Sequence, residues 1–220
     1  MDTINNLSIL DIKPDTETKA IVIWLHGLGA SANDFEPILP ILNEAIPGIR
    51  YVFPNAPLMS VSVNGGMTMP AWYDIIQPDL SRQQDLDGIE ASCDKLEGLV
   101  TEIQNQSTDN TPIILAGFSQ GGVIALTTAL TRSCNIRGVL ALSTYLPTLK
   151  MSDDTNKQDI NLLMMHGSGD PVVPIDFAKK SFEKLERLVT NAEWDEFPME
   201  HSLCYEEVVK IGEWLKKFTF

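Results

Sequence analysis

Residues 111–130, "TPIILAGFSQGGVIALTTAL", decide the fold. They begin with a short apolar run of the kind that forms a buried strand, and they end with a helical pattern whose first turns hold small residues. Between the two, Ser119 stands two positions from Gly117 on one side and two from Gly121 on the other. This G-x-S-x-G spacing leaves room for a strained strand-to-helix turn that lifts the hydroxyl clear of the sheet. The stretch therefore predicts a strand, a tight turn with an accessible serine, and a helix.

Similar apolar runs recur along the chain, and each is followed by a turn signal and a helical pattern. Because the runs are apolar throughout and do not alternate with polar residues, they indicate strands that are covered on both faces, as in a parallel sheet. The alternation of strand and helix predicts an α/β fold with a mostly parallel, doubly wound sheet and helices on both faces. The expected strands are 20–26, 50–54, 112–118, 137–143, 161–167 and 192–197, and the expected helices are 33–46, 83–105, 120–132, 176–190 and 205–218.

One long stretch, residues 54–80, interrupts this alternation. It carries four prolines, two adjacent glycines and three methionines, and it has no sustained period. A loop of that length inside a compact domain is usually functional. Since ligands of open α/β sheets bind at the carboxyl ends of the strands, we expect this loop to lie beside the active site.

Composition and charge limit the classes of protein and partner. The chain has 220 residues, of which 44% are hydrophobic, enough for one core, so we expect residues 1–220 to form a single domain. It carries 30 acidic and 16 basic residues without a basic cluster. A protein that binds nucleic acids or anionic membrane surfaces needs clustered positive charge, so we expect neither as a partner.

The apolar runs and the cysteines indicate a compartment. The longest apolar runs are far shorter than the roughly 20 residues that cross a bilayer, so no stable membrane insertion is expected. The amino-terminal "MDTINNLSIL" lacks the basic start and continuous apolar stretch of a secretory signal, which favours the cytoplasm. The cysteines, Cys93, Cys134 and Cys204, are odd in number and widely spaced, which is typical of free thiols and of neither a disulfide framework nor a metal cluster.

If Ser119 is a nucleophile, it needs a base to take its proton and a third group to orient that base. In folds of this type the chain order is nucleophile, acid, base, so the base must follow the acid. His26 precedes the serine, and His166 ends a predicted strand ahead of "GSGD". His201 remains, in the loop "FPMEHS" between the last predicted strand and the final helix, and we predict that it is the base.

The acid is expected after the strand that precedes the base. Asp170 stands there, in a Gly/Pro turn directly after the predicted strand 161–167. Asp176 is the nearest competitor, but it falls in a first helical turn, where a carboxylate favours the helix dipole. His26 and His166 each belong to an "HG" pair that leaves a strand, and we interpret both as structural groups that hold neighbouring loops.

An acyl-transfer site also needs donors for an oxyanion. The backbone N–H of the residue after the nucleophile supplies one, which here is Gln120, and the loop after an early strand supplies the other. In "WLHGLGA" we choose the Leu28 N–H, with Gly27 and Gly29 as alternatives. The same stretch lacks the third glycine and the acidic partner of a dinucleotide loop, so a nucleotide site is not expected.

Taken in order, the motifs resemble the small α/β-hydrolase family of carboxylesterases, acyl-protein thioesterases and lysophospholipases. The resemblance rests on "LHGLGA", "FPNAP", "NGGMTMPAWYD", "AGFSQGG", "ALSTYLP", "HGSGDPVVP" and "MEHS" and covers nearly the whole chain. It implies an α/β-hydrolase fold without a cap domain, the same triad and oxyanion amides as above, and a monomer or homodimer. It further implies an acyl channel lined by Leu58, Met59, Met67, Trp72, Tyr145 and Val172.

Two departures from the family pattern concern the site. Glu200 stands before the predicted base where the family usually has a small residue, which adds a carboxylate near His201 and is expected to raise the pKa of the base or to deter anionic substrates. Tyr145 stands where the family usually has tryptophan, which bears on the bulk and polarity of the acyl pocket.

These observations predict a serine hydrolase that needs no metal or cofactor and forms an acyl-serine intermediate. The expected substrate is an acyl ester or thioester of a small molecule or lipid, or an acylated protein; the sequence does not decide among them. The alternative is a non-catalytic protein that binds acyl chains on a hydrolase scaffold. A serine peptidase on this scaffold generally carries a cap or propeller domain, for which 220 residues leave no room.

Overall fold

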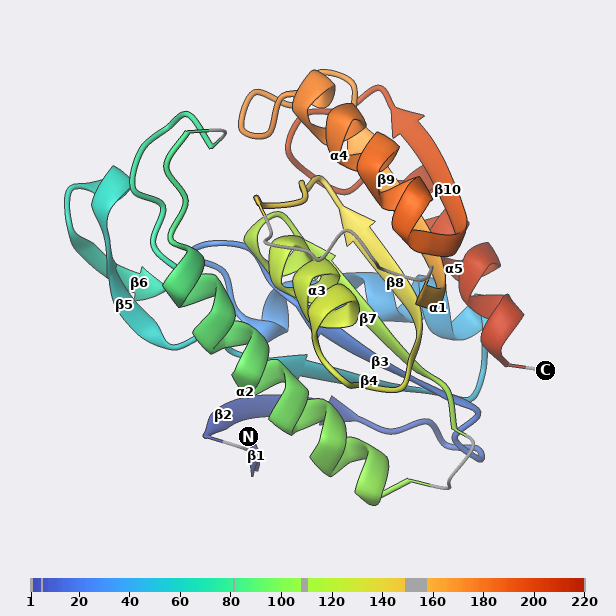
Figure 1. Cartoon of the computed structure of the whole chain (residues 1–220). Coiled ribbons are helices and arrows are strands. Elements are labelled where there is room, and N and C mark those ends of the chain that lie inside the picture. Colours follow the sequence, from blue (N-terminus) through green and yellow to red (C-terminus); the bar gives the residue numbers. More distant parts are fainter. Residues whose placement is uncertain (1, 5, 81, 108–110, 149–157, 220) are drawn as a thin grey trace.

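Strands from both halves of the chain form one central sheet (Figure 1). The computed structural model describes residues 2–4, 6–80, 82–107, 111–148 and 158–219, and within these residues the sheet has eight strands in the order β1-β2-β4-β3-β7-β8-β9-β10. Neighbours from β4 across to β10 pair in parallel, whereas β2 pairs antiparallel with β1 and with β4. The strands are β1 (Asp2–Ile4), β2 (Leu7–Ile12), β3 (Ala20–Leu25), β4 (Ile49–Pro54), β7 (Ile113–Phe118), β8 (Ile136–Leu142), β9 (Gln158–Gly167) and β10 (Val189–Phe197).

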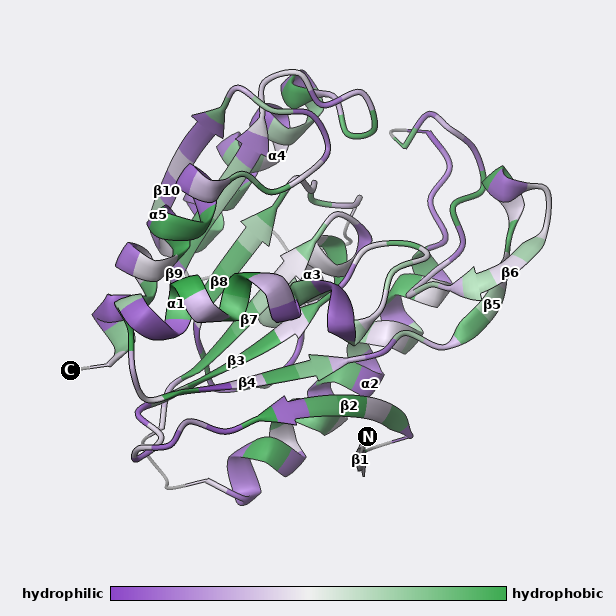
Figure 2. Cartoon of the chain, turned by 180° about the vertical axis from the view of Figure 1, so that it is seen from behind, coloured by the Kyte–Doolittle hydropathy of each residue, from purple (hydrophilic) through white to green (hydrophobic). Residues whose placement is uncertain are grey.

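Helices cover both faces of this sheet, as the apolar strands predict. On one face lie α2 (Leu86–Asn105), α3 (Gln120–Thr131) and α4 (Ile175–Leu188). On the other lie α1 (Leu39–Ala45) and α5 (Tyr205–Leu215). The central strands β3, β7 and β8 are hydrophobic along most of their length in Figure 2, because they are buried between the two layers. None of the described helices is long and apolar enough to span a bilayer.

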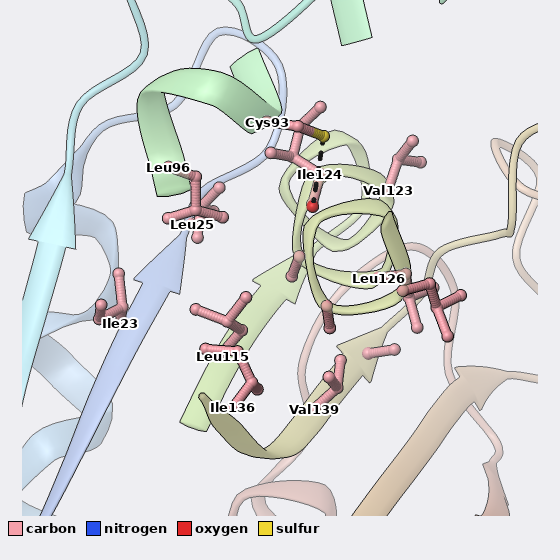
Figure 3. Close-up of a cluster of buried hydrophobic side chains, with 14 of the residues drawn as sticks. Ile23, Leu25, Cys93, Leu96, Leu115, Val123, Ile124, Leu126, Ile136 and Val139 are labelled. Carbon is pink, nitrogen blue, oxygen red and sulfur yellow. Dashed lines mark hydrogen bonds between the residues drawn. The ribbon is translucent and has the colours of Figure 1, made fainter. Parts of the chain in front are cut away.

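The larger core lies between the sheet and the layer of α2 and α3 (Figure 3). There Leu25 of β3, Leu115 of β7 and Val139 of β8 form the floor, and Cys93 of α2 approaches the Ile124 carbonyl of α3 with 3.9 Å between sulfur and oxygen. All three cysteines are free thiols. Since α3 is buried along almost its whole length, the helix that follows the predicted serine turn is anchored from several sides.

Two parts of the fold differ from the sequence-based prediction. The sheet gains β1 and β2, and the start of β2 alternates between buried and half-buried residues, so it gives no continuous apolar run. The stretch 54–80, predicted as a loop, contains a hairpin of β5 (Leu58–Val61) and β6 (Met67–Pro70), which stands away from the main sheet (Figure 1). A short 3-10 helix (Ser62–Asn64) and a turn in which Gly65 and Gly66 have φ of 67° and 80° connect the strands, and such positive angles favour glycine.

Candidate active site

Ser119 lies in the sharp turn between β7 and α3, with φ of 53° and ψ of −118°. A non-glycine residue at such a positive φ is strained, and the surrounding packing maintains it. A Cβ on Gly117 would lie 2.4 Å from the backbone of Gly121, and a Cβ on Gly121 would lie 2.4 Å from the Leu25 carbonyl oxygen. The Ser119 N–H donates to the Leu142 carbonyl at 2.9 Å. The two glycines therefore allow α3 to pack directly on the ends of β3 and β7, and this places the hydroxyl at the carboxyl edge of the sheet.

The structure brings the three residues predicted as a triad into one hydrogen-bonded chain. The Ser119 Oγ is 2.9 Å from His201 Nε2, and His201 Nδ1 is 2.6 Å from Asp170 Oδ2. The other carboxylate oxygen, Oδ1, accepts the backbone N–H groups of Val172 and Val173 at 2.8 and 2.9 Å. Because an ionised carboxylate only accepts, the imidazole proton lies on Nδ1 and the Nε2 lone pair faces the hydroxyl. This arrangement can activate the hydroxyl as a nucleophile.

His166 is buried beside the same carboxylate. Its Nε2 is 3.5 Å from Asp170 Oδ2 but donates to the Val173 carbonyl at 2.8 Å. Burial lowers the pKa of His166, against smaller raising contributions from the Val173 carbonyl and Asp170, so the ring is neutral at pH 7 and forms no ion pair. His166 thus holds the loop after β9, which agrees with its interpretation as a structural residue.

The Leu28 and Gln120 amides lie on the two loops predicted to form an oxyanion hole. Within the described residues neither N–H donates to a backbone carbonyl, so both can donate to a ligand. Gln120 opens α3, whose dipole favours negative charge at this end. His26, whose pKa is lowered by burial, donates from Nδ1 to the Gly27 carbonyl at 2.7 Å, and its Nε2 accepts the Ala56 N–H at 3.0 Å.

A cavity of about 540 Å³ opens over the serine. Its lining includes Ser119, His201 and Leu28, with Asp34 as its one acidic residue among the described residues. The walls are mainly apolar and come from Phe35, Ile38, Ile75, Phe118, Val172 and Leu203. A larger hollow of about 760 Å³ lies at the opposite, amino ends of the strands, around Lys19, and includes no predicted site residue. Within the described part of the chain no cluster of three His, Cys, Asp or Glu side chains is arranged to hold a metal ion.

The family model described as Phospholipase/Carboxylesterase matches residues 9–219. The chain belongs to this family. It is accordingly a hydrolase that cleaves carboxylic esters or thioesters, and its mostly parallel sheet is that of the α/β-hydrolase fold. It is similar to Acyl-protein thioesterase 1 of Cryptococcus neoformans var. neoformans, with 33% identity over 96% of this chain and 97% of the relative.

Solved structures give the same result for the fold. The crystal structure of Zea mays acyl-protein thioesterase 2 is 25% identical, covers 97% of this chain and 99% of its own, and superposes with a TM-score of 0.84. The Bacillus cereus carboxylesterase shares the fold at 19% identity and a TM-score of 0.80, with 96% of this chain and 94% of its own covered.

The residues predicted from the family pattern to line an acyl channel lie in different environments. Val172 is 52% exposed and lines the cavity. Trp72 and Tyr145 are buried; the Trp72 indole donates to the His26 carbonyl, and the Tyr145 hydroxyl is 3.1 Å from the Tyr73 hydroxyl. On the hairpin, Leu58 and Met67 are exposed and Met59 is half-buried, and none of the three is among the residues that line the cavity.

Sequence reasoning missed most of the apolar wall. Phe35 and Ile38 belong to a 3-10 helix (Ala32–Ile38) within the range predicted as one helix, and Leu203 follows the predicted base by two residues. Phe35 and Ile38 lie close in sequence to "LHGLGA", and Leu203 lies close to His201; this closeness was the one sequence feature that could have indicated their place in the wall. Glu200 is exposed beside His201, and its effect on the base stays a prediction.

Proposed function

We propose that this chain is a serine hydrolase in which Ser119 is the nucleophile, His201 the general base and acid, and Asp170 the group that orients the imidazole. The observation that carries the proposal is the continuous hydrogen-bonded chain from Ser119 Oγ through both imidazole nitrogens to Asp170 Oδ2. Three residues that are distant in sequence meet there, in the geometry that nucleophilic acyl transfer requires.

The reaction proceeds through an acyl-serine intermediate. Ser119 Oγ attacks the carbonyl carbon while its proton moves to His201 Nε2. The N–H groups of Leu28 and Gln120 donate to the oxyanion that forms. As the tetrahedral intermediate collapses, the bond to the leaving oxygen or sulfur breaks and His201 returns the proton to that atom. Water then attacks the acyl-serine by the same route, and the carboxylic acid is released.

The proposed substrates are acyl esters and thioesters, including S-acylated proteins. The mainly apolar cavity beside the serine supports an acyl chain as the bound group. Relatives named acyl-protein thioesterase support a thioester on a protein as one physiological form. A single domain, a monomeric or homodimeric state, and a cytoplasmic location remain predictions from the sequence.

The test measures hydrolysis of a chain-length series of p-nitrophenyl esters and of matched acyl thioesters. We expect Ser119→Ala to lower kcat by about 10⁴-fold or more, because the hydroxyl is the attacking group. Ser168→Ala is the matched control, since Ser168 is an exposed serine beside Asp170 that does not line the cavity. Labelling by a fluorophosphonate should require Ser119. Wild-type protein that binds fatty acid but neither hydrolyses these substrates nor reacts with the probe would support the non-catalytic acyl-binding alternative.

A further inference from the structure

Trp72 is a buried residue of the 54–80 segment, two residues after β6, and it is hydrogen-bonded to both loops that carry the proposed oxyanion amides. Its indole N–H donates to the His26 carbonyl at 2.9 Å, and its backbone N–H donates to the Gln120 side-chain oxygen at 2.9 Å. His26 is fully buried, and Trp72 and Gln120 are each 2% exposed. Water therefore cannot readily replace either bond, and one residue links the end of β3 to the start of α3.

The backbone on which Trp72 is mounted is itself fixed. The Gln120 side chain also donates from its amide nitrogen to the Tyr73 carbonyl at 2.6 Å, so it bonds to two successive residues of the segment. From the opposite side, the Ser92 hydroxyl of α2 donates to the Trp72 carbonyl. The backbone that carries the indole is thus held by α2 and α3 together.

The indole acts on the first loop through successive peptide groups. It fixes the carbonyl of His26, and the His26 ring fixes the carbonyl of Gly27. All described peptide bonds are trans, so the carbonyl and the N–H of one peptide group point in opposite directions. The Gly27 carbonyl shares its peptide group with the Leu28 N–H, and Leu28 lines the cavity, so holding the carbonyl also fixes the direction of that N–H. Ala56 completes the arrangement, because its N–H requires a bare Nε2 and leaves the His26 proton on Nδ1.

We infer that Trp72 is a positioning residue for the oxyanion hole, and that its indole N–H sets the placement of the Leu28 amide relative to the Gln120 amide. The inference rests on the proposed function. Trp72 is not among the residues that line the cavity, so it acts through His26 and Gln120 and does not contact an acyl chain there. Donors that stabilise an oxyanion contribute in the transition state and not in the bound ground state.

The test compares Trp72→Phe with Trp214→Phe. Both tryptophans are 2% exposed, but the Trp214 indole N–H has no partner among the described residues, and Trp214 packs on the other face of the sheet. Both variants lose an indole, but Trp72→Phe alone loses a hydrogen bond. We expect Trp72→Phe to lower kcat about 10- to 100-fold with KM within about twofold, because acylation and deacylation use the same oxyanion donors. Trp214→Phe is expected to keep wild-type kcat.

A second readout separates positioning from general damage. A trifluoromethyl ketone forms a tetrahedral oxyanion with the serine, so its inhibition constant should rise in Trp72→Phe by about the factor lost from kcat/KM. If Trp72→Phe does not fold, Ser92→Ala removes the support of the Trp72 carbonyl from outside the site, and we expect a smaller fall in kcat with the same unchanged KM.

Three results would overturn the inference: unchanged kcat in whichever of these two variants folds, an equal loss in Trp214→Phe, or a loss that appears in KM alone. Failure of the proposed function is distinct, because wild-type protein would then be inactive or Ser119→Ala would retain activity.

Discussion

Glu207 makes the stability of this protein depend on pH. It lies in the first turn of α5, its side chain is fully buried, and within the described residues neither carboxyl oxygen has a hydrogen-bond partner. Burial raises the pKa of Glu207 from 4.5 to about 8. The nearby backbone of Cys204 lowers this pKa by a smaller amount, although it forms no hydrogen bond with the carboxyl group. At pH 7 the folded protein therefore keeps this carboxyl protonated, whereas the unfolded chain ionises it.

The direction of the effect follows from proton binding. Below pH 4.5 the group is protonated in both states, and its own contribution to stability is at its highest. Between pH 4.5 and about 8 the unfolded chain releases the proton and the folded chain retains it, so rising pH favours unfolding. Above about 8 both states are ionised and no further loss occurs. At 1.36 kcal/mol per pKa unit the full loss is roughly 5 kcal/mol, of which roughly 3 kcal/mol has occurred by pH 7.

Glu207→Gln removes the titration and keeps the shape. Urea unfolding of both proteins at pH 5, 7 and 9 gives the free energy of unfolding at each pH. We expect the difference, variant minus wild type, to increase by about 4 kcal/mol from pH 5 to pH 9, with the larger part below pH 7. Glu206→Gln is the control, because Glu206 is exposed in the same helical turn and should give a flat difference. A difference for Glu207→Gln that is equally flat would refute the reasoning.

Three other perturbations test the site and its frame. Asp170→Asn should lower kcat about 10⁴-fold in ester hydrolysis, because the imidazole loses its tautomer and orientation; a loss below tenfold would contradict the role. Gly121→Ala should destabilise the fold by about 2 kcal/mol or more in urea unfolding, since its Cβ meets the backbone oxygen of Leu25, and a neutral result would mean that the turn can open. Asp11→Asn should cost about 3 kcal/mol in the same assay because it leaves the buried Arg50 guanidinium without its two-pronged partner, and it should not alter KM.

The sequence specified the meeting of Ser119, Asp170 and His201 because each follows a strand, and parallel strands place their carboxyl ends along one edge. It did not specify the cavity walls. Phe35 and Leu203 line the cavity because the irregular segments that carry them pass close to the serine. The path of such segments leaves no periodic pattern in the sequence. The same limit applies to Trp72, whose aromatic ring suits an acyl channel as well as a buried hydrogen-bonded position. Strand β2 escaped prediction since only one of its faces is buried.

The proposed base lies in the loop after an edge strand of the sheet. His201 follows β10, the outermost strand of the parallel set, which pairs along one side only and is half-buried over most of its length. Edge elements of this kind detach at lower free energy than a central strand such as β7, which carries Ser119. We therefore expect hydrolytic activity to be lost in mild denaturant before circular dichroism detects a change in secondary structure. Activity would then report local unfolding at β10.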